Sequence, residues 1–247
     1  MKILLLSDIH ANFPALDALG RQFPLDSFDL ILNGGDSLVY GPFPNQTIDW
    51  LRNHRAISIL GNTDRHVITL LDGKTFKKPR APDKRIMYGW TAAELTTENR
   101  SWLLQQPHTR LIPLNGDSNT DADVSEVLHM CHGSPADADE FLFPDTPADR
   151  FRELTPLAGG RLVTVGHSHT QFHTVVSGVH FINPGSVGRM FDGRVSGACG
   201  VICINRGKIE VELHRVPYPV DIVAEEILRL RLPSIYAEMF VRGMKLN

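Results

Sequence analysis

Residues 2–10 read Lys-Ile-Leu-Leu-Leu-Ser-Asp-Ile-His, a short apolar run that ends abruptly at polar side chains. Such a run is typical of a buried β-strand. A helical pattern follows, in which Phe13, Leu16 and Leu19 share one face and Gly20 stands near the end. A strand that leads directly into a helix favours an α/β core built from crossover connections.

The same order of elements recurs downstream. Residues 29–32 and 56–60 are apolar runs that close with Asn-Gly-Gly-Asp and Gly-Asn, and a helix is predicted between them over 45–53. Further strands are predicted over 109–114, 127–131, 162–165, 174–177, 179–182, 201–204 and 209–216, and further helical segments over 63–106, 219–230 and 233–241. This order predicts two packed sheets flanked by helices. Because no repeat or composition break is visible, one domain over residues 1–247 is expected.

Composition excludes several classes of protein. With 42% hydrophobic and 21% charged residues, the chain is neither disordered nor fibrous. A net charge of −3, from 25 basic and 28 acidic residues, gives no strong nucleic-acid signal. The first apolar run is too short for a signal peptide, and no segment is long enough to span a membrane. Three cysteines form no disulfide framework, so a cytoplasmic protein is expected, while its oligomeric state stays open.

Polar residues able to bind a cation follow the predicted strands. These residues are Asp8, His10, Asp36, Asn62, His132, His167 and His169. In open α/β sheets, sites form beyond the carboxyl ends of the strands, where these residues can converge. The i, i+2 spacing of Asp8 and His10 in an extended segment points both side chains to one side. The same holds for His167 and His169.

Each of these residues has an ordinary reading by itself. Asp8 could be a helix N-cap, Asp36 and Asn62 could be turn residues, and His132 could be a structural histidine. Their occurrence together at five strand ends favours a metal site. Four histidines, two aspartates and one asparagine exceed the needs of a single tetrahedral ion and suit two cations that share a carboxylate. These donors suit Mn, Fe, Ni, Zn or Mg alike, because such sites follow metal availability as much as affinity, and Mn is the first expectation.

Five blocks carry a family resemblance. They are Asp8-x-His10, Gly35-Asp36, Gly61-Asn62-x-Asp64, His132-Gly133 and Gly166-His167-x-His169. In this order they resemble the calcineurin-like metallophosphoesterases, over residues 3–188. Residues 35–42 and 183–188 are similar to the small bacterial single-domain branch of that family. The resemblance implies an α/β fold of four layers, αββα, with two mixed sheets flanked by helices.

The resemblance also implies roles for individual residues. Asp8, His10 and His169 would hold one metal ion, Asn62, His132 and His167 the other, and Asp36 would bridge them. The implied catalytic residues are Asp36, Asn62, Asp64 and His132. The expected activity is that of a phosphodiesterase, in which a hydroxide bridging two metal ions attacks phosphorus in line without a phosphoenzyme. The alternatives are a phosphomonoesterase acting on small metabolites and a non-catalytic scaffold of the same fold.

The chain departs from the family pattern at Thr63, where many members have a histidine. A threonine hydroxyl can donate a hydrogen bond to substrate but cannot serve as an acid near neutral pH. His66 is expected to face solvent. Asp64 is expected either to orient a ligand histidine or to cap a helix.

Three further residues are candidate substrate contacts. Ser186 and Arg189, on the turn that begins at residue 183, are candidate phosphate contacts, although a purely structural loop is the favoured reading. Tyr40 is expected either to pack near the substrate or to anchor its loop.

Charge is distributed unevenly along the chain. Six basic residues lie between Lys74 and Arg85, a run read as a solvated face that could also steer an anion. From Leu111 to Asp149 there are nine acidic residues and no lysine or arginine, among them Asp117, Asp121 and Asp123. This acidic stretch disfavours a long polyanion, so small phosphoesters or nucleotides are the expected substrates.

Overall fold

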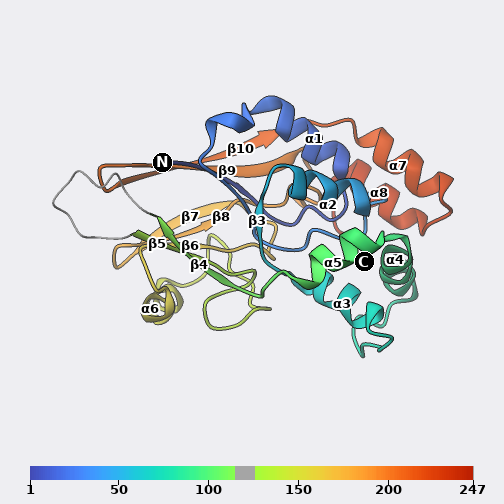
Figure 1. Ribbon diagram of the computed structural model, residues 1–247, viewed down its shortest axis with the longest axis horizontal. Coiled ribbons are helices and arrows are strands. Elements are labelled where there is room, and N and C mark those ends of the chain that lie inside the picture. Colours follow the sequence, from blue (N-terminus) through green and yellow to red (C-terminus); the bar gives the residue numbers. More distant parts are fainter. Residues whose placement is uncertain (115–125, 247) are drawn as a thin grey trace.

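A computed structural model describes residues 1–114 and 126–246, which form two stacked sheets of mixed strand direction (Figure 1). The first sheet has the strand order β10-β9-β1-β2-β3. Its strands are β1 (Lys2–Leu6), β2 (Leu30–Asn33), β3 (Ile57–Ser58), β9 (Gly197–Asn205) and β10 (Lys208–Val216). Strands β1, β2 and β3 run parallel, whereas β9 is antiparallel to both β1 and β10. Strand β1 therefore lies between β2 and the hairpin formed by β9 and β10.

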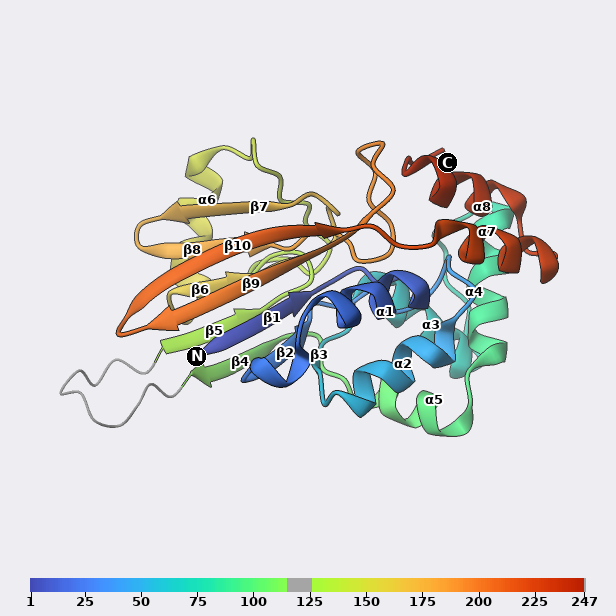
Figure 2. The same cartoon turned by 90° about the horizontal axis from the view of Figure 1, so that it is seen from above.

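The second sheet has the strand order β4-β5-β6-β8-β7. Its strands are β4 (Arg110–Leu114), β5 (Glu126–Met130), β6 (Leu162–Thr164), β7 (Phe172–Val176) and β8 (Val179–Asn183). Here β5, β6 and β8 run parallel, and the two edge strands are antiparallel to their neighbours. Both sheets therefore contain three adjacent parallel strands, and the carboxyl ends of those strands point to the same end of the molecule (Figure 2).

Helices cover the outer faces of both sheets and crowd one end of the molecule (Figures 1 and 2). They are α1 (Phe13–Gln22), α2 (Pro44–Asn53), α3 (Asn62–Leu71), α4 (Pro82–Glu94), α5 (Thr97–Leu104), α6 (Ala148–Leu154), α7 (Val220–Arg229) and α8 (Ser234–Arg242), with 3-10 turns at η1 (Leu25–Ser27) and η2 (Thr155–Leu157). Helices α1 and α2 lie on the first sheet and α6 lies on the second. The predicted four-layer αββα fold is confirmed.

The alternation of side chains along β1 shows how the layers are held together. Ile3 and Leu5 point between the sheets, into a core cluster that includes Leu128 of β5. Leu4 and Leu6 point outward and pack in a second cluster with α1. Because successive side chains of a strand face opposite sides, one apolar run fills both layers.

Several elements differ from the sequence predictions. Strand β3 has only two residues instead of the five predicted, because the chain leaves the sheet as it turns into α3. Helix α6 was not predicted, since only Phe151 and Leu154 of its seven residues are buried and so short a pattern has no visible period. The helical segment predicted over 63–106 contains three helices. The hairpin predicted around Arg206-Gly207 is confirmed, with positive φ at both residues.

Among the residues that the structure describes, no helix combines the length and apolar character needed to cross a membrane.

Candidate metal centre

The loops that follow five strands bring the candidate ligands together. Asp8 and His10 follow β1, Asp36 follows β2, and Asn62 begins α3 directly after β3. His132 follows β5 and His167 and His169 follow β6, so each sheet contributes ligands. The convergence that the sequence predicted thus arises at the shared carboxyl end of parallel strands.

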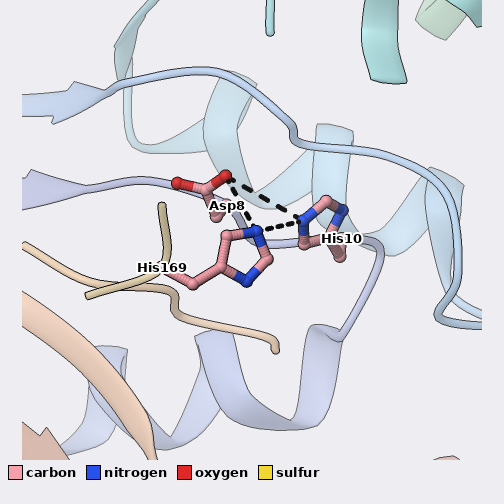
Figure 3. A group of neighbouring side chains, drawn as sticks. All are labelled: Asp8, His10 and His169. Atoms are coloured by element: carbon pink, nitrogen blue, oxygen red, sulfur yellow. Dashed lines mark hydrogen bonds and ion pairs between the residues drawn. The ribbon is translucent and has the colours of Figure 1, made fainter. Parts of the chain in front are cut away.

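The first cluster consists of Asp8, His10 and His169, whose polar atoms point toward one another (Figure 3). Asp8 Oδ1 lies 3.3 Å from His169 Nε2 and 3.9 Å from His10 Nε2. The two Nε2 atoms are 3.1 Å apart. All three side chains are buried.

The second cluster consists of Asp36, His132 and His167. His132 Nε2 lies 3.5 Å from Asp36 Oδ1, while the other oxygen of Asp36, Oδ2, lies 3.8 Å from His10 Nε2 in the first cluster. One carboxylate therefore presents one oxygen to each cluster. A carboxylate can serve two cations in this way, whereas a histidine serves one.

Backbone carbonyls orient three of the histidines. The Nδ1 atoms of His10, His132 and His169 donate to the carbonyl oxygens of Leu38, Gly34 and Arg189, at 3.3, 2.8 and 2.6 Å. A hydrogen bond at one ring nitrogen fixes the tautomer and leaves the lone pair of the other nitrogen available. In this arrangement the Nε2 lone pairs of His10 and His169 face each other. The two lone pairs repel each other unless a proton or a cation lies between them.

The carboxylate of Asp8 also has an atom that a bound cation would satisfy. Its Oδ2 accepts from the Ser7 hydroxyl at 2.7 Å and from the His167 backbone nitrogen at 3.1 Å. Its Oδ1, which faces the first cluster, is buried and has no hydrogen-bond partner in the described part of the chain. Because an unsatisfied buried charged atom is costly, a metal ion fits this position well.

The amide of Asn62 completes the second cluster. The amide atom that faces inward lies 3.2 Å from His132 Nε2, 2.8 Å from His167 Nδ1 and 3.3 Å from Asp36 Oδ2. An amide nitrogen at this position would donate to these acceptors, whereas an amide oxygen would repel them unless a cation lay between. The residues present therefore fit a second metal ion, bound through the oxygen of Asn62.

The protonation states favour metal binding at the first cluster. Burial would raise the pKa of Asp8, but the nearby His169 and His132 together outweigh it and lower that pKa to about 2. Burial lowers the pKa of His10 to about 3, so its imidazole is neutral at pH 7. At His132, burial would lower the pKa, but the nearby carboxylates of Asp36 and Asp8 and the hydrogen bond to Gly34 together outweigh it and raise the pKa to about 9. A proton and a cation therefore compete for His132.

The backbone turns sharply at most of the ligands. Asp8, His10, Asp36, His167 and His169 have φ values of 53°, 53°, 51°, 64° and 57°. The left-handed region costs an ordinary residue about 1–2 kcal/mol, and such strain is retained where the surrounding structure enforces it, as at functional sites. The predicted extended geometry of the two pairs is wrong, because left-handed turns direct these side chains to the centre.

Gly61 lies directly against the carboxylate of Asp36. A Cβ at this position would overlap Asp36 Oδ1 and the Asp36 backbone nitrogen. We therefore expect Gly61→Ala to displace Asp36 and to lower the Mn²⁺ retained per chain after dialysis, measured by elemental analysis, while circular dichroism still shows a folded protein. Gly89→Ala in α4 is the control, since nothing lies within 4 Å of its added Cβ. Equal Mn²⁺ content in both variants would contradict this role of Gly61.

Thr63 and Asp64 support the loop of Asp36. The backbone nitrogen of Thr63 donates to Asp36 Oδ1 at 2.7 Å, and its hydroxyl donates to the carbonyl of Leu38 at 3.0 Å. The buried carboxylate of Asp64 accepts from the backbone nitrogens of Ser37 and Leu38 and, as a helix cap, from that of Gly61. Asp64 thus holds backbone segments, and its hydrogen bonds do not run to a ligand histidine. Burial raises its pKa to about 7, with the charge of Asp36 adding to the effect.

His66 was predicted to face solvent, but the structure shows it packed against other side chains. Its Nδ1 donates to the backbone carbonyl of Asn62 at 2.6 Å, and its half-buried ring packs edge-on against Phe76. The prediction was wrong because Phe76, in the connection between α3 and α4, folds back over this face of α3.

The candidate substrate contacts lie beside the first cluster. The Ser186 hydroxyl donates to the carbonyl of Asp8 at 2.6 Å and accepts from the Arg189 backbone nitrogen at 2.7 Å. The Arg189 guanidinium lies 3.9 Å from the centre of the Tyr40 ring. That ring in turn meets His10 edge-on at 5.3 Å. Ser186 therefore connects its own loop to the backbone of Asp8. Tyr40 and Arg189 form a stack that extends outward from His10.

Two aromatic residues at the centre had no signal in the sequence. Phe141 stacks on His167 with ring centres 3.9 Å apart, and Phe191 stacks on His169 at 4.7 Å. Both come from loops without periodic pattern, so spacing gave no reason to select them. Of the acidic stretch, Asp117, Asp121 and Asp123 lie outside the described residues.

Known proteins resemble the chain over nearly its whole length. The family model for the calcineurin-like phosphoesterase superfamily domain matches residues 1–205. An uncharacterised protein of Methanocaldococcus jannaschii is 29% identical over 259 residues, covering 98% of each chain. A metallophosphoesterase from Sphaerobacter thermophilus has a TM-score of 0.78 at 25% identity, and a hypothetical protein from Pyrococcus horikoshii has 0.84 at 18%; each alignment covers 99% of both chains. The second of these structures shows the likeness of fold alone.

Proposed function

The chain belongs to the calcineurin-like phosphoesterase superfamily, and we propose that it is a phosphodiesterase that uses two divalent metal ions to hydrolyse small phosphoesters or nucleotides. The observation that carries this proposal is Asp36, whose two oxygens face His132 and His10 in different clusters. We also propose that residues 1–247 form one domain. The apolar core shared by the two sheets supports this.

The proposed division of ligands follows the geometry of the clusters. Asp8, His10 and His169 would hold one ion, and Asn62, His132 and His167 the other, with Asp36 between them. Two such ions, for which Mn is our first choice, would stabilise charge on the phosphoryl oxygens and lower the pKa of water. The protein itself orients the imidazoles through backbone carbonyls and keeps the two aspartates ionised.

The position of Thr63 supports a preference for substrates with good leaving groups. Its buried hydroxyl already donates to the Leu38 carbonyl, so it has no proton free for a departing oxygen. A substrate whose leaving group needs little protonation avoids this deficit.

The phosphodiesterase proposal is tested by comparing hydrolysis of bis-p-nitrophenyl phosphate with that of p-nitrophenyl phosphate, in Mn²⁺-loaded and in chelator-treated protein. Faster metal-dependent hydrolysis of the diester supports the proposal, and faster hydrolysis of the monoester overturns the diester preference.

Arg189 is proposed to supply a protein cation beside the reacting phosphate. The side chain is only 8% exposed, and within residues 1–114 and 126–246 its guanidinium forms no ion pair. It lies instead on Tyr40, with the sulfur of Met239 3.9 Å away. A buried cation without an acidic partner is costly, and an anionic substrate would satisfy it.

We expect Arg189→Met to raise the inhibition constant of inorganic phosphate and to lower kcat/KM about tenfold or more, because hydrogen bonds to charged groups contribute about 1.5–3 kcal/mol. The measurement is steady-state hydrolysis of the diester with phosphate as the competing anion. Arg194→Met, which removes an exposed arginine from the same loop, serves as the matched control. Unchanged phosphate inhibition in Arg189→Met would show that Arg189 is only a packing residue.

A further inference from the structure

The centre is partly open at His167. Asp8, His10, Asp36 and His132 are at most 2% exposed, whereas His167 and Asn62 are only partly buried. A substrate whose phosphate reaches the two clusters can therefore extend past His167. The residues that surround this imidazole determine which organic group can accompany the phosphate.

An exposed aromatic ring lies on this open side. Phe141 stacks on His167, with ring centres 3.9 Å apart and an angle of 25° between the planes. The side chain of Phe141 is nevertheless 54% exposed, so one face covers the imidazole and the rest is open. Phe143 lies nearly parallel to it at 6.2 Å and is 39% exposed. Two exposed phenylalanines therefore border the mouth of the centre.

The loop that carries these rings is firmly held. Leu142, between the two phenylalanines, is 1% exposed and packs in the core under α6. The Glu140 carboxylate accepts two hydrogen bonds from Arg150, at 2.7 and 3.0 Å. The backbone nitrogen of Phe143 donates to the Thr146 hydroxyl at 2.8 Å. The exposure of Phe141 is therefore built into the loop, and its ring is positioned before any ligand binds.

The charge around the rings favours an uncharged occupant. Asp137, Asp139 and Asp145 lie in the same loop, and among the residues that the structure describes only Asp139 is paired with a basic side chain, Arg65. Additional phosphate groups on this side would be repelled by these carboxylates. A planar aromatic group without charge would instead gain stacking energy on the open face of Phe141.

We propose that Phe141 determines substrate specificity by stacking on a nucleobase, so that the substrates of this centre are nucleotides and not aliphatic phosphoesters. The inference rests on the proposed phosphodiesterase function and deepens it. The phosphate would lie at the two metal clusters, and the base would lie outside them, on the ring that covers His167.

The test compares two diesters with the same leaving group. The p-nitrophenyl ester of thymidine 5′-phosphate carries a base, and methyl p-nitrophenyl phosphate does not. We expect Phe141→Ala and Phe141→Leu to raise KM for the thymidine ester about tenfold and to leave the methyl ester within about twofold, since stacking on an aromatic ring is lost in both variants. Phe141→Trp should preserve the preference. Equal losses on both substrates would mean that Phe141 only shields His167, which overturns the inference.

A binding measurement separates failure of this inference from failure of the proposed function. If the Mn²⁺-loaded protein hydrolyses neither diester, the phosphodiesterase proposal fails. Calorimetry with adenosine 5′-phosphate and ribose 5-phosphate then still tests the stacking. We expect the nucleotide to bind about tenfold more tightly, and Phe141→Ala to remove the difference. Equal affinity of wild-type protein for the two ligands overturns the role of Phe141.

Discussion

Asp36→Asn is expected to lower metal-dependent hydrolysis of bis-p-nitrophenyl phosphate by about a thousandfold or more. Asp36 is the residue that presents one carboxylate oxygen to each cluster. An asparagine keeps the shape but offers one neutral oxygen, so it can serve one cation at most. The charge stabilisation that two metal ions supply amounts to several kcal/mol, which corresponds to a factor of this size.

The measurement is kcat/KM at saturating Mn²⁺, with the metal content of each protein determined in parallel. Asp17→Asn removes a carboxylate that pairs with Arg21 on the surface of α1 and should behave as wild type. The Asp36→Asn variant should retain less than two ions per chain. Full turnover by that variant would exclude Asp36 as the bridging ligand.

Metal ions are expected to raise the midpoint of thermal unfolding by about 10–20 °C. Without a cation, the buried Oδ1 of Asp8 has no partner, and the Nε2 lone pairs of His10 and His169 face each other at 3.1 Å. Binding relieves both conditions. At a hundredfold excess over Kd each site contributes about 2.7 kcal/mol, and each kcal/mol shifts the midpoint by about 2–4 °C in a chain of this size.

Calorimetric scans of metal-free protein with and without Mn²⁺ measure this shift. Asp8→Asn should lose about half of it, because only the first cluster is impaired. His173→Gln, which replaces an exposed histidine on β7 that is not among the candidate ligands, should show the full shift. An unchanged midpoint in wild-type protein at millimolar Mn²⁺ would mean that the clusters do not bind the ion in the folded state.

The sequence predicted that the candidate ligands would lie together, because their position depends on topology. Apolar runs such as residues 2–6 and 29–32 mark strands, and the residues after parallel strands meet at one edge of a sheet. This rule predicted that Asp8, Asp36 and His132 lie close together, although it contains no information about local backbone geometry. The layered fold followed from the same order of elements.

Local geometry could not be predicted in the same way. The left-handed turns at His10 and His169 depend on tertiary contacts, such as the hydrogen bond from His169 to the Arg189 carbonyl. The support that Asp64 gives to Ser37 and Leu38 joins segments that no sequence pattern links. Phe141 stacks on His167 because Leu142 is buried, a contact that belongs to the folded chain alone.

The most direct test of the two-metal centre is a titration of metal-free protein with Mn²⁺ in which bound metal and diester hydrolysis are measured on the same samples. The account predicts two ions bound per chain and turnover that appears as the second site fills. Full turnover with a single bound ion, or turnover that survives complete removal of metal, would contradict it.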